Sequence, residues 1–274
     1  MLSQITPPRG GLVADGRTGV VMIGGMRTWI TNLPYQEELS GLVDRVERDP
    51  NVVGVLLTGS YAHGLASSGC DVDLHVLLSE RDDSWQPLRQ GGLDLQVHDA
   101  QWLRRVPSDP SRWWDRYRIA RGRLVTDRSG GALGADLRAW GTLSSVEQAD
   151  AVDFALTPYL TYAMRSLYEF RTGELAAARL DAVENLPWAL RLMFALQGRP
   201  RPTNRYLAWE LEHHPLTTPA WKSEWVLGIV EALRRDGSPA AQRELFAAME
   251  PPLRALGFGG VLDGDSRAVS LLRI

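Results

Sequence analysis

The sequence has little cysteine, little lysine and no long apolar run. Among its 274 residues Cys70 is the one cysteine, which excludes an intramolecular disulfide and a cysteine-based zinc finger. Lys222 is the one lysine. No stretch approaches the roughly 20 consecutive apolar residues of a membrane span, and residues 1–11 lack the basic and apolar regions of a secretory signal. We therefore expect a cytoplasmic protein with no membrane partner.

An excess of one charge sign is also missing. The 30 basic and 33 acidic residues give a formal net charge of -3, with no long single-sign run. Proteins that bind many nucleic-acid phosphates usually carry a basic stripe. The charge pattern therefore argues against a nucleic-acid partner, while 44% hydrophobic content provides ample material for a buried core.

Local patterns divide the chain into three parts. Residues 1–31 are rich in Gly, Pro and Thr and are predicted to form a leader or a hairpin. Apolar residues at helical spacing predict a helix that starts after Pro34 and ends before Pro50. Short apolar or alternating runs predict strands at residues 52–57, 71–78, 91–98 and 118–126.

Helix-forming residues dominate from about residue 131 onward. Long amphipathic stretches predict helices over 145–171 and 174–197. The predicted fold class is α+β, with an N-terminal mixed sheet flanked by helices and a C-terminal all-α helical bundle. The predicted domains are 32–130 for the sheet and 131–274 for the bundle.

Candidate functional residues cluster between the first and third predicted strands. The Gly59-Ser60 turn follows an apolar strand, and such a turn can offer backbone N–H groups to an anion. After ten further residues comes Asp71-Val72-Asp73, whose two carboxylates share one face of a strand. Asp94 lies on the third predicted strand. If these strands are neighbours, three carboxylates converge.

Converging carboxylates repel one another unless cations lie between them. Mg²⁺ prefers carboxylate oxygens and keeps substrate phosphates in its remaining positions. Two such ions could polarise a phosphoryl group and lower the pKa of an attacking hydroxyl. A zinc or manganese site with Asp and His ligands is a rival interpretation, but it would leave the Gly59-Ser60 turn unexplained.

Other features in the sequence admit a functional or a structural interpretation. An acidic pair on an alternating strand can be a solvated face. His75 and His98 are expected to be buried or supporting residues rather than metal ligands. Trp113 and Trp114, beside Asp115, could stack on a base or pack a domain seam.

A proline-rich loop at residues 199–206 carries several arginines ahead of a predicted helix at 207–212. Arg205 in this loop, and Lys222 after it, are candidates to contact a triphosphate. A solvated loop between domains is the alternative.

The pattern of Gly59-Ser60, ten residues, Asp71-Val72-Asp73 and a later Asp94 resembles the nucleotidyltransferase superfamily that includes DNA polymerase β. Its small-molecule branch contains the aminoglycoside and lincosamide nucleotidyltransferases of antibiotic resistance. The resemblance covers residues 52–98. Two positions depart from it, since Cys70 replaces a serine that often contacts phosphate and Thr58 replaces an apolar or aromatic residue.

The resemblance implies a role for each matching residue. Gly59 and Ser60 would bind the triphosphate of ATP or another NTP. Asp71 and Asp73 would ligate Mg²⁺, and Asp94 would complete one of two metal sites and assist deprotonation of an acceptor hydroxyl.

The implied reaction is a Mg²⁺-dependent transfer of a nucleoside monophosphate, AMP from ATP, to a hydroxyl of a small molecule, with release of pyrophosphate. An aminoglycoside or lincosamide antibiotic is the suggested acceptor class. Two alternatives stay open: a protein AMP-transferase or antitoxin-like partner of the same superfamily, and a non-catalytic nucleotide-binding sensor. The sequence specifies neither the acceptor nor an oligomeric state.

Overall fold

The computed structural model describes residues 36–264 and 266–273, so the leader or hairpin predicted for residues 1–31 lies outside the described residues. Within them, the strands form one five-stranded mixed sheet in the order β3-β4-β2-β1-β5. The β2–β4 pair is parallel and the other neighbouring pairs are antiparallel. The strands are β1 (Val52–Thr58), β2 (Val72–Leu78), β3 (Leu88–Gln90), β4 (Leu93–Asp99) and β5 (Arg123–Asp127).

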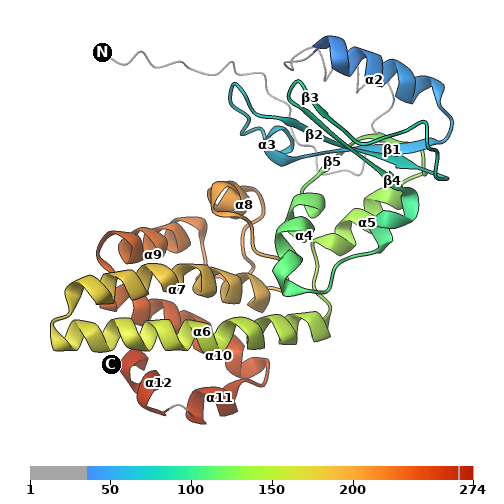
Figure 1. Ribbon diagram of the computed structural model, residues 1–274. Coiled ribbons are helices and arrows are strands. Elements are labelled where there is room, and N and C mark those ends of the chain that lie inside the picture. The colour runs from blue at the N-terminus through green and yellow to red at the C-terminus, as the bar shows by residue number, and fades with distance from the viewer. Residues whose placement is uncertain (1–35, 265, 274) are drawn as a thin grey trace, which may run out of the picture.

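Helices cover both faces of this sheet (Figure 1). On one face α2 (Gln36–Arg48) packs Leu39 and Val43 against Leu74 of β2. On the other face α4 (Trp113–Ala120) and α5 (Ala132–Trp140) bury Ile119, Leu133 and Trp140 against Leu56 and Leu77. Successive strand residues point to opposite faces, so each strand supplies both cores.

The strands predicted at 52–57, 71–78 and 91–98 are confirmed to within two residues. The strand predicted over 118–126 is wrong in its first part, because residues 118–120 belong to α4 and β5 begins at Arg123. Trp113, Arg116 and Tyr117 are buried at helical spacing, and their packing extends the helix to Ala120. Gly122 then lies against Leu56, where a Cβ would approach to 2.7 Å.

The second half of the described chain is helical. The two longest helices, α6 (Ser145–Thr172) and α7 (Leu175–Leu196), confirm the predictions to within one residue. Ser144 and Glu147 form a capping box at the start of α6, and Gly173 separates the two helices with a positive φ of 87°. The helices that follow are α8 (Leu207–His213), α9 (Ser223–Asp236), α10 (Pro239–Ala255), α11 (Gly259–Gly264) and α12 (Ser266–Arg273).

One apolar core holds these helices together, with members such as Tyr159, Phe194, Trp221 and Phe246. Trp113 of α4 inserts into the same core, which makes it a packing residue at the seam with the sheet, whereas Trp114 is exposed. The fold class is therefore α+β, a mixed sheet with flanking helices followed by a mostly helical region. None of the described helices is long and apolar enough to cross a membrane.

The helix α5 follows residue 130, yet it packs on the sheet and not in the helical core. The domain boundary at residue 130 stays a prediction. In Figure 1, α8 lies on the side of the helical region that faces the sheet. Three short 3-10 segments complete the described structure: Ala100–Arg104, Pro110–Arg112 and Asn204–Tyr206.

Candidate active site

The chain turns sharply where β1 ends. Gly59 has a φ of +68°, and a Cβ on it would lie 2.1 Å from Oδ2 of Asp73. Both facts require glycine, because other residues disfavour this conformation and would collide with the carboxylate. Ser60 follows in the one-turn helix α3 (Gly59–Ala62). The Gly59-Ser60 turn therefore lies directly against Asp73.

The register of the sheet brings the predicted carboxylates to one end of the strands. Asp73 of β2 is opposite Asp94 of β4, and Thr58 of β1 is opposite Asp73. Asp71 comes directly before β2. Gln96 donates a hydrogen bond from Nε2 to Oδ1 of Asp94 at 2.7 Å, which fixes that carboxylate.

The environment of Asp73 disfavours the ionised form of its carboxyl group. Burial raises the pKa of its carboxyl group, and the neighbouring Asp94 and Asp71 charges raise it further, while Arg118 and Arg89 act in the opposite direction. A raised carboxyl pKa means that the ionised form lacks sufficient positive charge around it. A cation bound at Asp73 would supply that charge.

Within the described part of the chain, no group of three or more His, Cys, Asp or Glu side chains is arranged to hold a metal ion. Arg89 lies 3.6 Å from Asp71 and 3.9 Å from Asp94, where it faces both carboxylates. The chemistry of the donors nevertheless fits Mg²⁺, since all three are carboxylates. The Arg89 side chain is 78% exposed, and such long surface ion pairs are weak enough for a divalent ion to displace.

A cavity of about 300 Å³ opens beside Asp73 and Asp94. Its wall also includes Arg112, Asp115 and Arg118, in and before α4. Asp115 is 3.1 Å from Arg112 and 3.9 Å from Arg118, so two guanidinium groups share this one carboxylate. The rings of Trp102 and Trp140 complete the wall opposite the carboxylates.

His75 and His98 form a hydrogen-bonded pair at the bottom of this cavity, with Nδ1 of His75 3.0 Å from Nε2 of His98. Nη1 of Arg118 lies 3.4 Å from Nε2 of His75. Because a guanidinium can only donate, Nε2 of His75 accepts and its Nδ1 carries the proton that is donated to His98. Burial, and then the charge of Arg118, lower the pKa of His75 to about 3 and that of His98 to about 4. Both rings are therefore neutral at pH 7.

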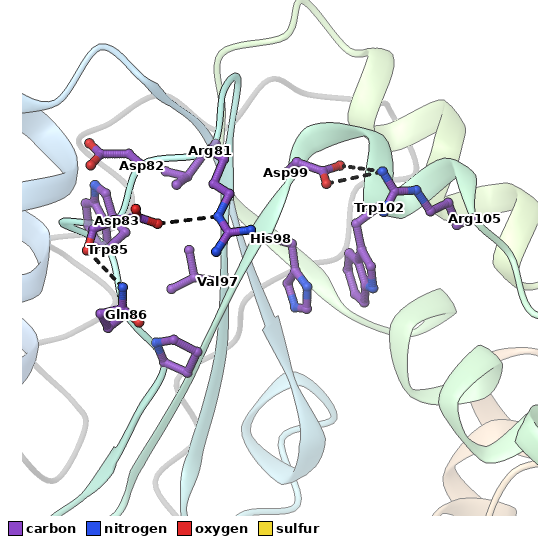
Figure 2. Close-up of a pocket in the computed structure, with 12 residues that line it drawn as sticks. Arg81, Asp82, Asp83, Trp85, Gln86, Val97, His98, Asp99, Trp102 and Arg105 are labelled. Atoms are coloured by element: carbon purple, nitrogen blue, oxygen red, sulfur yellow. Dashed lines mark hydrogen bonds and ion pairs between the residues drawn. The ribbon is translucent and has the colours of Figure 1, made fainter.

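A second cavity of about 350 Å³ shares a wall with the first, because His98 and Trp102 line both. Figure 2 shows it between β4 and the loop that carries Arg81 to Gln86. The His98 and Trp102 rings are stacked, with centroids 3.9 Å apart. Arg105 of this cavity is paired with Asp99 at 3.2 Å. The two cavities together offer an extended space next to Asp94.

Of the two basic residues predicted to contact a triphosphate, Arg205 and Lys222, one lies near the Gly59-Ser60 turn. Arg205 donates a hydrogen bond from Nη2 to the carbonyl oxygen of Leu65 at 3.1 Å and lies 3.7 Å from the Cys70 sulfur. Lys222 instead lines a cavity of about 520 Å³ with residues of α8 and α9. The structure therefore brings Arg205, and not Lys222, to the turn.

Cys70 is close to the same turn. Its sulfur accepts from the backbone N–H of Ser67 at 3.4 Å, and hydrogen bonds from Ser67, Ser60 and Arg205 lower the pKa of the thiol to about 7. The residue at the position of the expected serine therefore contacts the turn through a polarised thiol.

The sequence patterns do not identify several residues of this site. Arg118 falls in a segment predicted as a strand, although the helical spacing of Trp113, Arg116 and Tyr117 indicates α4. Tyr206 contacts Ser60 across 146 residues, with its hydroxyl 3.3 Å from Oγ. His63 contacts the carbonyl oxygen of Gly59 at 2.7 Å, and no sequence signal marks either contact.

One comparison with known proteins, the match to a family model, covers the residues of this site. Residues 39–111 match the family model of the nucleotidyltransferase domain. A search of curated proteins finds no match. Among solved structures, a nucleotidyltransferase-like protein from Exiguobacterium sibiricum 255-15 is 16% identical over 92% of this chain and 79% of that chain. Its TM-score of 0.37 is too low to support an argument. The segment that carries Gly59, Asp71, Asp73 and Asp94 is thus matched by the nucleotidyltransferase domain family.

Proposed function

We propose that the protein transfers a nucleoside monophosphate, AMP from ATP, to a hydroxyl group of a small molecule and releases pyrophosphate. The observation that carries this proposal is the contact of the Gly59-Ser60 turn with Asp73, which in turn lies opposite Asp94. A phosphate-binding turn and a carboxylate pair at the mouth of one cavity are the parts that nucleotidyl transfer requires.

Each residue has a defined task in the proposed reaction. Gly59 and Ser60 bind the triphosphate, and Arg205 adds positive charge beside them. Asp71, Asp73 and Asp94 would hold one or two Mg²⁺ ions, which when bound neutralise charge on the phosphates and on the departing pyrophosphate.

The bond changes balance without a further reactant. The acceptor oxygen forms a bond to the α-phosphorus while the bond from that phosphorus to the pyrophosphate oxygen breaks. Asp94 accepts a hydrogen bond from the acceptor hydroxyl and assists removal of its proton. Trp102 and Trp140 line the adjoining cavity, where they would position the acceptor and exclude water.

Two features favour a small acceptor over a polynucleotide. The chain is acidic overall, and Asp94 lines a half-open cavity of about 300 Å³ that has mixed charges on its wall. An aminoglycoside or lincosamide antibiotic is the acceptor class suggested by family resemblance. The wall of this cavity carries three carboxylates, from Asp73, Asp94 and Asp115, and two guanidinium groups, from Arg112 and Arg118. An excess of one negative charge favours acceptors with few amines over a polycation.

The direct test is an acceptor panel with each common NTP and Mg²⁺, in which pyrophosphate is measured and products are identified by mass spectrometry. We expect turnover with ATP, and loss of turnover in Asp73→Asn. Asp150→Asn, an exposed position on α6, is the matched control. Label on a co-purified protein would favour the protein AMP-transferase, and nucleotide binding without pyrophosphate release would favour the sensor.

The metal is tested without an acceptor. Because burial, and then the charges of Asp94 and Asp71, raise the pKa of Asp73, we expect Asp73→Asn to raise the thermal midpoint in the absence of metal. We also expect Mg²⁺ to raise the midpoint of the wild type and to leave that of Asp73→Asn unchanged. An equal response of both proteins to Mg²⁺ would place the ion elsewhere.

A further inference from the structure

The Gly59-Ser60 turn is held by the helical region as well as by its own sheet. The hydroxyl of Tyr206 lies 3.3 Å from Oγ of Ser60. The ring of Tyr206 stacks on His63, with centroids 4.1 Å apart and an interplanar angle of 12°. Arg205 contacts the carbonyl oxygen of Leu65 at 3.1 Å. Neighbouring residues of one segment therefore contact Ser60 of the turn and two residues shortly after it, His63 and Leu65.

We propose that Tyr206 is a positioning residue that orients the Ser60 hydroxyl toward the triphosphate, so that the helical region forms part of the nucleotide site. This inference rests on the proposed function, because it assigns a task to the same turn. It adds a residue that lies outside the segment matched by the family model, residues 39–111.

The direction of the hydrogen bond follows from the chemistry of the two hydroxyl groups. A phenol is more acidic than an aliphatic alcohol, so Tyr206 is the better donor and Ser60 the better acceptor. With a lone pair of Oγ occupied by Tyr206, the proton of Ser60 points away from the phenol. It is donated to the Cys70 sulfur here and can turn to a phosphate oxygen when a triphosphate binds. A Ser60 hydroxyl that donated to Tyr206 would present only lone pairs to the phosphate.

Tyr206 is itself held in a fixed position. It is buried at the start of α8, and its backbone N–H donates to the carbonyl oxygen of Thr203 at 3.0 Å. Glu210, one turn further on, is 0% exposed and accepts hydrogen bonds from Nε and Nη2 of Arg121 at 2.8 and 2.6 Å. Arg199 contacts the same carboxylate. This charge cluster joins α8 to the end of α4 and fixes the distance from Tyr206 to the turn.

His63 provides the second connection between Tyr206 and the turn. Its Nδ1 donates to the carbonyl oxygen of Gly59 at 2.7 Å, and its Nε2 accepts from the hydroxyl of Tyr117 at 3.1 Å. Since the acceptor at Gly59 is a carbonyl, Nδ1 must carry the proton. The stacked ring of Tyr206 covers His63 and keeps this arrangement dry. A phenylalanine at position 206 would preserve the stacking and remove only the bond to Ser60.

The experiment is a double-mutant cycle on nucleotide binding, measured by isothermal titration with ATP and Mg²⁺. We expect Tyr206→Phe to weaken binding by about five-fold, the effect of one lost hydrogen bond, and Ser60→Ala by about ten-fold. We expect the double variant to bind no more weakly than Ser60→Ala alone, because Tyr206 acts through that hydroxyl. Tyr168→Phe, on an exposed side chain of α6, is the control and should bind as the wild type does.

Thermal unfolding separates positioning from a structural role. Tyr206→Phe keeps the ring, so its thermal midpoint should match that of the wild type. If Tyr206 had only a structural role, its effect on ATP binding would not depend on the Ser60 hydroxyl. Additive losses in the double variant, or unchanged affinity of Tyr206→Phe beside a weakened Ser60→Ala, would overturn the inference. Absence of binding to the wild type by any NTP with Mg²⁺ would overturn the proposed function itself.

Discussion

Oδ2 of Asp73 occupies the space that a side chain on Gly59 would need, 2.1 Å from the ideal Cβ position. The contact ties the two halves of the site together, because the residue that turns the chain toward the phosphate also sets the position of a carboxylate. A change at Gly59 must therefore move Asp73 as well.

The first prediction uses this contact. Gly59→Ala should displace Asp73 and abolish pyrophosphate release, and it should lower the free energy of unfolding by more than the about 1–2 kcal/mol expected for the left-handed conformation alone. Gly64→Ala is the control, because Gly64 has the same φ of +68° and nothing within 4 Å of its Cβ position. Urea unfolding measures the loss of stability, and pyrophosphate release measures the loss of activity. Equal losses in the two variants would show that the Asp73 contact is unimportant.

The second prediction separates binding from transfer at Asp94. Asp94→Asn keeps the shape of the side chain, including an oxygen that can accept from Gln96. MgATP binding should therefore change little, whereas transfer should fall by about 10²–10⁴-fold because the group that assists deprotonation is lost. Asp136→Asn, whose side chain pairs with Arg104 at 3.4 Å, is a matched control. Retained turnover of Asp94→Asn would remove Asp94 from this role.

The third prediction concerns pH and the His75–His98 pair. In the folded protein the pKa of His75 is lowered to about 3 and that of His98 to about 4, chiefly by burial, whereas unfolded histidines titrate near 6.5. Between these values the unfolded chain binds more protons than the folded one. The stability contributed by the neutral rings is therefore complete above about pH 6.5 and is lost as the pH falls toward about 4.

Each of the two histidines should contribute up to about 1.4 kcal/mol of unfolding free energy per pH unit in that range. Urea unfolding at pH 7, 6 and 5 measures the slope, before most carboxylates titrate. His75→Gln should flatten it, since glutamine can still accept from Arg118 and does not titrate. Gln90→Asn, at an exposed position on β3, removes no titrating group and should leave the slope unchanged. The same slope in both variants would contradict the assignment to His75.

The fourth prediction tests the charge cluster between α4 and α8. Burial acts to raise the pKa of Glu210, but the hydrogen bond and charge of Arg121, with the charge of Arg199, outweigh it and hold this pKa below its usual value. Glu210→Ala would leave two arginines without their shared partner and should destabilise the protein by about 3–5 kcal/mol.

The control for this prediction is Glu231→Ala, which removes an exposed carboxylate paired with Arg234 and should lower the free energy of unfolding far less than Glu210→Ala does. Urea unfolding compares the two variants. If Glu210→Ala costs no more than the control, the cluster does not stabilise the junction between α4 and α8.

Backbone periodicity explains which parts of the fold the sequence predicts correctly. Alternation over Val72 to Leu78 is enough to predict a strand with Asp73 and His75 on one face, because the period of two is a property of the backbone. The same reasoning failed at Arg118 to Ala120. There the buried aromatic residues of α4 impose a helical period, and that packing overrides the β-favouring composition of the segment.

The residues of the site also fall into two groups, those that local sequence patterns predict and those that they do not. Gly59, Ser60, Asp71, Asp73 and Asp94 are close in the chain, and strand alternation with a tight turn predicts that they converge if the strands are neighbours. The pairing of β2 with β4 in the structure meets that condition. Tyr206 and Arg205 are 146 and 140 residues away from their partners Ser60 and Leu65. No local pattern encodes such contacts.

By itself, the sequence determined the strands β1, β2 and β4, the long helices and the order of the turn and its carboxylates, because backbone periodicity and steric limits act over a few residues. Only the tertiary structure decided that Arg89 faces Asp71 and Asp94, that Arg118 reaches His75, and that Tyr206 meets Ser60. These contacts depend on how separate elements pack and on which buried charges find partners, and both are properties of the assembled molecule.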